Sequence, residues 1–171
     1  NSITFSLLAY TDQTLSIFYG TESGNYISQT DPITLKANIP RTFQLSNLQP
    51  ATKYFYSINN DEQHTFHTAR PAGSTFTFTI QADSHLDSNT SAEVYLQTLA
   101  NQRADHPDFV IDLGDTFMTE KYKPYTDALP QYLAQRYFFG QLADTAPLFL
   151  VLGNHDGEGA PRGKDGAETS V

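Results

Sequence analysis

Residues 147–156 read Pro-Leu-Phe-Leu-Val-Leu-Gly-Asn-His-Asp, an apolar run that leads from a proline into a polar cluster. A short apolar run bounded by turn residues is typical of a strand buried in a sheet. Turn chemistry accounts for Gly153 and Asn154, since both residue types favour tight turns. It gives no reason for His155 and Asp156, whose imidazole and carboxylate are groups that bind cations. We therefore expect a functional site directly after this strand.

Two earlier apolar runs end in a similar way. Alternating residues at 76, 78 and 80 lead to Asp83-Ser84-His85, and the run at 109–111 leads to Gly114-Asp115. Either motif alone is weak evidence for a metal site, because Asp and Gly are common in turns after strands. Three such endings in one chain, each offering oxygen or nitrogen donors, favour a shared metal site.

The segments between these strands are predicted to be helical, at about 91–104 and 129–143. Thr90 and Glu93 have the spacing of a capping box at the start of the first helix. Its buried side is assigned to Val94, Leu96, Leu99 and Ala100. Strand, helix, strand, helix, strand is the order of a parallel sheet, because parallel neighbours need a crossover. Ligands bind beyond the carboxyl ends of such strands, so the three polar endings should meet in space.

Residues 1–70 have a different pattern, in which short strands rich in β-branched and aromatic residues alternate with turn residues. The strands are expected at 2–10, 13–19, 25–30, 39–45, 53–58 and 63–68. This spacing predicts an all-β sandwich, separated by a Pro- and Gly-containing linker from a second domain at 71–171.

The sequence at 48–56 resembles the turn into strand F of fibronectin type III domains. In those domains a tyrosine closes a corner by bonding to upstream backbone, and Tyr54 is the candidate here. The alternative is an aromatic strand whose alternate positions simply pack a sheet. If the resemblance holds, residues 2–10 form the second strand of the sandwich, and the first strand is expected to be missing.

The amino-acid composition of the chain restricts the kinds of binding partner and metal site that are expected. The net charge is −9, which argues against nucleic acid as a partner, because nucleic acids are bound mainly by Lys and Arg. A small anionic substrate is compatible with this charge, since bound cations invert the local potential. Without cysteine, neither a disulfide nor a thiolate metal site is available. No apolar run reaches the roughly 18 residues of a membrane span.

Taken together, Asp83-x-His85, Gly114-Asp115 and residues 153–156 resemble the first three signature blocks of calcineurin-like metallophosphoesterases, over about residues 75–157. The resemblance implies a four-layer α/β/β/α sandwich with two metal ions at its strand ends, of which this chain holds the N-terminal half. It also implies that Asp83 and His85 bind the first ion and that Asp115 bridges both ions.

The third block supplies the remaining roles that the resemblance implies. Asn154 would bind the second ion by its amide oxygen. His155 would face the phosphate as a transition-state stabiliser or general acid, and Asp156 would orient its neighbours. His155 and Asp156 are thus the expected catalytic residues, and Asp83, His85, Asp115 and Asn154 the expected metal ligands.

The function implied by this resemblance is that of a metal-dependent phosphoesterase, a phosphatase or phosphodiesterase. It would hydrolyse a small phosphate ester by a metal-activated hydroxide. Ligand types leave the two divalent or trivalent ions open among Mn, Fe, Zn and Ca. One alternative is a non-catalytic interaction or scaffold protein with a degenerate phosphoesterase fold. Another is a nucleotide hydrolase of the same fold.

The sequence departs from the family pattern after the third block. The family completes its site with a lone histidine and a Gly-His-x-His block, whereas no histidine follows His155 here. We therefore expect a fragment that is inactive alone, needs the remainder of its own chain to complete the site, and exposes apolar sheet faces. The N-terminal domain is similar to that of exported purple acid phosphatases, so export is expected. Met118 stands where those enzymes place a tyrosine.

Overall fold

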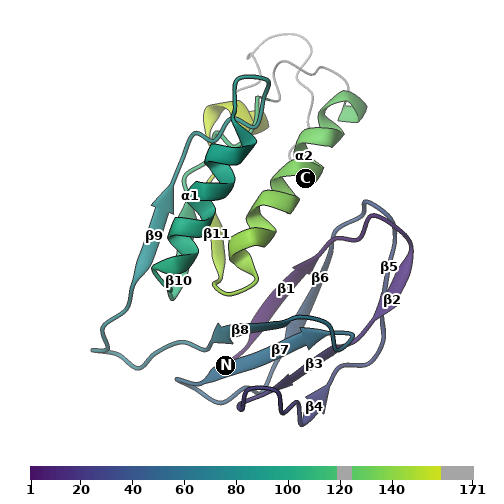
Figure 1. Cartoon of the computed structure of the whole chain (residues 1–171), viewed down its shortest axis with the longest axis vertical. Coiled ribbons are helices and arrows are strands. Elements are labelled where there is room, and N and C mark those ends of the chain that lie inside the picture. The colour runs from purple at the N-terminus through teal and green to yellow at the C-terminus, as the bar shows by residue number, and fades with distance from the viewer. Residues whose placement is uncertain (119–124, 159–171) are drawn as a thin grey trace. The chain divides into compact units, whose positions relative to one another are not determined.

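The structure of the protein, a computed structural model, describes residues 1–118 and 125–158 (Figure 1). The chain divides into two compact units, Asn1–Phe76 and Thr77–Val171, called unit 1 and unit 2. Unit 1 contains only strands, whereas unit 2 alternates strands with helices. Among the described residues no helix is both long and apolar enough to cross a membrane. The domain division at residue 70 and the export of the protein stay predictions.

Unit 1 is built from antiparallel strands in three small sheets. Two of the sheets are pairs, β1 (Ile3–Leu7) with β6 (Arg41–Leu45) and β2 (Gln13–Leu15) with β5 (Ile33–Leu35). The third has the order β4 (Ser28–Gln29), β3 (Ile17–Gly20), β7 (Lys53–Ile58) and β8 (Gln63–His67). All three sheets contribute side chains to one core, which includes Leu7, Leu15, Ile17, Ile33, Tyr54 and Phe66.

Two strands of unit 1 differ from the sequence-based expectation. The segment at 13–19 is not one strand but two, β2 and β3, which lie in different sheets. At the break, the N–H of Ser16 donates to Asn59 Oδ1 at 2.8 Å instead of joining a ladder. Strand β5 was not expected at all. Its burial alternates, with Ile33 and Leu35 buried, but it is so short that the neighbouring turn residues hide the pattern.

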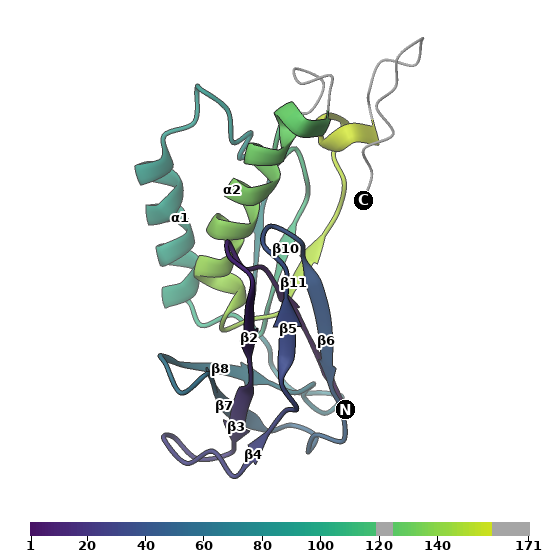
Figure 2. The ribbon, with the colours of Figure 1, turned by 90° about the vertical axis from the view of Figure 1, so that its right-hand side faces the viewer.

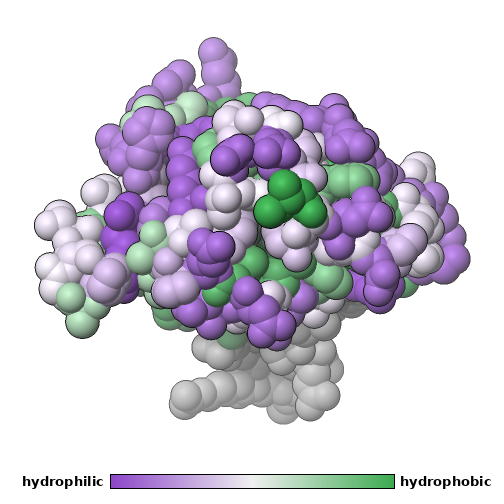
Figure 3. Space-filling view, turned by 90° about the horizontal axis from the view of Figure 1, so that it is seen from below, coloured by the Kyte–Doolittle hydropathy of each residue, from purple (hydrophilic) through white to green (hydrophobic). Residues whose placement is uncertain are grey.

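The surface of unit 1 carries few large apolar side chains. Tyr10, Ile27 and Ile39 are exposed, at separate places in the sequence. Figure 3, which views the chain from the lower side of Figure 1, shows mainly hydrophilic residues with hydrophobic ones in small groups. Apolar residues scattered in this way are ordinary for a protein surface.

Tyr54 is buried on β7, where its ring stacks on that of Phe66 with 5.2 Å between ring centroids. Its Oη accepts the backbone N–H of Gln49 at 2.9 Å, five residues upstream. This is the contact expected of a tyrosine corner, so that prediction is confirmed. The assignment of the whole unit as fibronectin type III-like stays a prediction.

We expect Tyr54→Phe to lower the free energy of unfolding by about 1 kcal/mol, the typical net contribution of one hydrogen bond. Urea unfolding followed by circular dichroism measures the change. Tyr10→Phe is the control, because the Tyr10 side chain is 58% exposed and its loss should leave unfolding unchanged. Equal stability of the Tyr54 variant and the parent protein would show that the corner bond contributes nothing.

Unit 2 contains a parallel sheet in the order β11 (Leu148–Leu150), β10 (Phe109–Asp112) and β9 (Phe78–Gln81). The helices α1 (Ala92–Ala104) and α2 (Tyr125–Ala143) connect the strands. Both helices lie on the same face of the sheet (Figures 1 and 2). The core between them includes Tyr95, Leu99, Val110, Phe138 and Leu142. The predicted alternation and parallel direction of the strands are confirmed.

The opposite face of this sheet is apolar and exposed. Phe78, Ile80 and Phe149 on that face are 45%, 53% and 58% exposed. Phe109, on the central strand, stacks on Phe78 at 5.3 Å and meets Phe149 edge-on at 5.8 Å between ring centroids. The expected exposure of an apolar sheet face is therefore confirmed.

The start and the buried side of α1 differ from expectation. Ser91 is the N-cap, and its Oγ accepts the N–H of Val94, whereas Thr90 donates its hydroxyl to Ser84 O at 2.9 Å. The predicted capping box is therefore wrong. Val94 is 65% exposed and Ala100 is also exposed, which contradicts their assignment to the core. Leu99 is buried and Leu96 packs against the core, as expected. The helix also buries Tyr95 and Gln102, so that two polar side chains face the sheet.

Candidate metal centre

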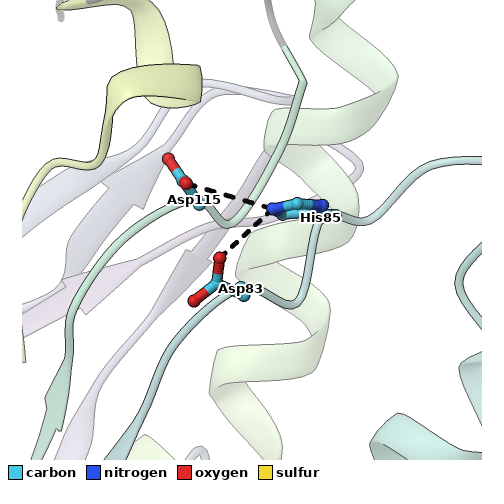
Figure 4. Close-up of side chains that lie close together, drawn as sticks. All are labelled: Asp83, His85 and Asp115. Atoms are coloured by element: carbon cyan, nitrogen blue, oxygen red, sulfur yellow. Dashed lines mark ion pairs between the residues drawn. The ribbon is translucent and has the colours of Figure 1, made fainter.

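Three of the predicted ligands meet at the carboxyl ends of β9 and β10 (Figure 4). Asp83, His85 and Asp115 each offer a ligand atom, and these atoms all lie within 4.8 Å of one another. His85 Nε2 is 3.5 Å from Asp83 Oδ1 and 4.0 Å from Asp115 Oδ2. We call these three residues the triad. The convergence expected from the strand order is thus present.

Backbone hydrogen bonds join the two loops that carry the triad. The N–H of Asp83 donates to Gly114 O, and the N–H of His85 donates to Asp115 O, each at 3.0 Å. All three triad residues have positive φ, at 59° for Asp83, 53° for His85 and 52° for Asp115. Non-glycine residues adopt this conformation rarely, and it persists where surrounding contacts impose it. The backbone is therefore shaped to direct these side chains toward one another.

The donor set fits a metal ion. His85 Nε2 is buried and has no hydrogen-bond partner in the described part of the chain, an arrangement that costs about 1 to 3 kcal/mol unless another group satisfies the nitrogen. The nearest carboxylate oxygens face it from 3.5 and 4.0 Å. Ligand atoms that surround an ion at about 2.1 Å stand roughly 3 to 4 Å apart, so the spacing suits coordination. Two carboxylates and an imidazole also suit the divalent cations expected from the sequence.

Asp156 joins the third motif to the second. It lies in the short π-helix η2 (Asn154–Glu158), and its carboxylate is buried. The carboxylate accepts the N–H groups of Asp115 at 2.7 Å, Thr116 at 2.8 Å and Gly153 at 2.9 Å. It also accepts the Thr116 hydroxyl at 3.1 Å. Asp156 therefore ties together the loops that follow β10 and β11.

His155 lies beside the triad. Its backbone N–H donates to Asp115 Oδ1 at 2.9 Å, which leaves Asp115 Oδ2 as the oxygen nearer His85. The rings of His155 and His85 meet edge to face, with 5.6 Å between centroids. Asn154 begins η2 with its side chain exposed. Its expected role as a ligand, like the roles of the other five site residues, stays a prediction.

Comparison with known proteins identifies the family. The model of the calcineurin-like phosphoesterase family matches residues 76–170, which is more than half of the chain. The chain belongs to this family. A comparison with curated proteins found no match.

A solved structure has a fold similar to that of this chain. Purple acid phosphatase PPD1, isolated from yellow lupin (Lupinus luteus) seeds, is similar with a TM-score of 0.62 at 17% sequence identity. The similarity covers 90% of this chain and 33% of that chain. The likeness concerns the fold, and it includes both the all-β unit and the α/β unit. The present chain spans about one third of the length of that phosphatase.

Two glycines let the strand ends of unit 2 approach closely. Gly114 has a φ of 92°, and a Cβ added to it would stand 2.7 Å from Val151 O. A Cβ added to Gly153 would overlap the Asp115 side chain. Only glycine accommodates the positive φ at position 114 and the close approach of neighbouring atoms at both positions. The family-typical glycines before Asp115 and Asn154 therefore have a steric reason in this structure.

Several polar residues of unit 2 contact the site loops, although they belong to none of the sequence motifs. Asp112 is 1% exposed, and burial raises the pKa of its carboxyl. The hydrogen bonds from Gln81 and from the Gly114 N–H act in the opposite direction and lower this pKa, but burial is the larger effect. On α2, Gln131 donates to Leu86 O at 3.3 Å and Gln135 to the Thr116 hydroxyl at 2.8 Å. A signal for Asp112 was available, because period-two alternation places it on the same face as buried Val110.

We expect Asp156→Asn to lower the free energy of unfolding by about 2 to 3 kcal/mol, because an amide NH₂ would face backbone N–H donors in a buried position. Thermal unfolding of the complete protein measures the loss. Asp105→Asn, an exposed aspartate at the end of α1, is the control and should unfold like the parent. If both variants unfold alike, the carboxylate does not hold the loops together.

Proposed function

We propose that this protein is a metal-dependent phosphoesterase that hydrolyses a small phosphate ester. The observation that carries the proposal is the triad, in which two carboxylates lie near a buried imidazole nitrogen that lacks a hydrogen-bond partner within residues 1–118 and 125–158. Membership of the calcineurin-like phosphoesterase family supports the same reaction class. A small ester is also compatible with the charge of −9, which disfavours a polyanion.

In this proposal the residues at the strand ends would hold two ions. Asp83 and His85 would hold the first ion, Asp115 would serve both, and Asn154 would hold the second by its amide oxygen. When bound, such a pair of cations lowers the pKa of water and neutralises phosphate oxygens. The donor chemistry of carboxylate, imidazole and amide leaves Mn, Fe, Zn and Ca open.

His155 is the proposed acid or transition-state stabiliser. Its backbone is fixed by the bond to Asp115 Oδ1, and its ring lies against that of His85. A side chain placed so close to the triad can reach a phosphate bound there and protonate a leaving oxygen. Asp156 assists by holding the backbone of Asp115 and Gly153 rather than by touching the substrate.

The exposed face of the sheet motivates the proposed architecture. Phe78, Ile80 and Phe149 form an apolar surface opposite α1 and α2. We propose that a second sheet of the same protein covers this surface, which would give a four-layer α/β/β/α arrangement and bring further ligands to the second ion. Burial of such a surface is favourable at about 25 cal/mol per Å².

Metal dependence is tested by turnover of a chromogenic phosphate ester by the complete protein with added Mn²⁺. We expect activity that disappears on chelation and returns with Mn²⁺. Comparison of monoester, diester and nucleotide substrates separates a general phosphoesterase from a nucleotide hydrolase. A protein that binds the metal without turning over any of these esters would instead be a scaffold.

The shared role of Asp115 predicts a difference in metal stoichiometry. Asp115→Asn should weaken the binding of both ions by more than about tenfold, because the carboxylate that both ions share is lost. Asn154→Ala should release only the second ion. Metal content after dialysis, measured by elemental analysis, distinguishes the two variants. Asp105→Asn is the control for loss of an exposed charge. Full metal content and turnover in the Asp115 variant would contradict the proposal.

The role of His155 predicts a change in rate rather than in metal binding. We expect His155→Asn to lower kcat by about 100-fold or more, the usual contribution of a general acid. Its metal content should remain that of the parent, since the ring is not one of the triad donors. His106→Asn changes an exposed histidine of the same unit and serves as the control. An unchanged kcat in the His155 variant would remove it from the mechanism.

A further inference from the structure

A row of buried polar side chains lies next to the triad, between α1 and the sheet. Gln81 ends β9 and Asp112 ends β10, and the two residues are register partners. Gln81 Nε2 donates to Asp112 Oδ2 at 2.7 Å and to Tyr95 Oη at 2.9 Å. Gln102 Nε2 donates to Gln81 Oε1 at 2.7 Å. The row therefore connects α1, through two strand ends, to the loop that carries Asp115.

Packing alone does not account for these polar groups. Asp112 is 1% exposed, and a buried carboxylate destabilises a fold relative to an apolar side chain of similar size, even when it is hydrogen-bonded. Gln102 Oε1 is buried and finds no hydrogen-bond partner among the residues that the structure describes, which adds to the cost. An apolar residue at position 112 would extend the core formed by Val110 and Leu99. The carboxylate therefore calls for an explanation other than stability.

The explanation lies in the turn that follows β10. Asp112 Oδ1 accepts the N–H of Gly114 at 2.9 Å, the bond of an Asx turn. Directly after this bond the backbone passes through two left-handed residues, Gly114 at 92° and Asp115 at 52°. The carbonyls of these same two residues accept the N–H groups of Asp83 and His85. The turn therefore sets both the direction of Asp115 and the docking of the other two triad residues.

We propose that Asp112, held in place by Gln81, is a positioning residue for Asp115. The inference rests on the proposed function only in taking Asp115 as a metal ligand. Asp112 orders the Gly114–Asp115 turn before a metal arrives, so that binding does not have to order it. Substitution of a group that orients a metal ligand in this way typically lowers the affinity of the protein for the metal.

Two substitutions of Asp112 distinguish a role in positioning Asp115 from a role in packing the core. Asp112→Asn keeps an oxygen acceptor for the Gly114 N–H. Its new NH₂ faces Gln81, whose amide can turn over together with that of Gln102, because Gln102 Oε1, which has no hydrogen-bond partner among the described residues, then accepts the turned Gln81 NH₂. Asp112→Leu keeps the branch at Cγ and is somewhat larger, and it removes both the buried charge and the acceptor. The Asn variant should therefore keep the turn, and the Leu variant should lose it.

The first measurement is calorimetric titration of the complete protein with Mn²⁺, together with its melting temperature. We expect Asp112→Leu to bind Mn²⁺ about 10- to 100-fold more weakly while melting at or above the temperature of the parent. Asp112→Asn should bind close to the parent. Thr79→Val is the matched control, since the buried Thr79 hydroxyl, on the same face of β9 as Gln81, has no hydrogen-bond partner among the described residues. The control should leave affinity unchanged.

The second measurement needs no metal. Hydrogen exchange of the Gly114 amide, followed by NMR in the metal-free protein, should be fast in Asp112→Leu and slow in Asp112→Asn and the parent. Should Asp112→Leu not fold, Gln81→Met removes the support of Asp112 and should likewise speed this exchange. If the parent binds no Mn²⁺, the proposed function fails, and the exchange result still decides the role of Asp112. Unchanged exchange in the folded variant, or parent-like Mn²⁺ affinity in Asp112→Leu, would overturn the inference.

Discussion

The candidate site depends first on one buried carboxylate, that of Asp156. It accepts backbone N–H groups from Asp115 and Thr116, about forty residues earlier in the chain, and from Gly153 beside it. A carboxylate suits this task because it only accepts hydrogen bonds and its two oxygens can take several donors. The parallel pairing of β10 with β11 brings the donors within reach, and the two glycines remove the side chains that would keep the loops apart.

Stability and function are divided between two layers of unit 2. Close to the helices, Leu99, Val110 and Leu142 form an apolar core that holds the sheet. At the strand ends, Asp112 and Asp156 are buried at 1% and 6% exposure, and burial raises the pKa of Asp112. Such groups cost free energy that the apolar core has to offset. The strand ends are thus specified by polar contacts that position the loops rather than by contacts that maximise stability.

The sequence was sufficient for those features that repeat locally or follow from strand order. Apolar runs ending in Asp83, Asp115 and Asn154 predicted three parallel strands with their polar ends together, and the structure has this arrangement. Features that depend on long-range partners were not predictable. The buried side of α1 was predicted only in part, because Tyr95 meets Gln81 and no local period shows that contact. Asp112 was likewise not singled out, since its partners lie 31 residues away and at Gly114.

Charge links metal binding to substrate binding in the proposed function. The end of the sheet gathers Asp83, Asp115 and Asp156 in a chain whose net charge is −9. A phosphate ester is repelled by this arrangement, and only bound cations reverse the local potential. Each ion that binds therefore favours the substrate, and by linkage the substrate favours retention of the ions. A loop geometry formed before binding strengthens this coupling, because neither ligand then has to order the backbone.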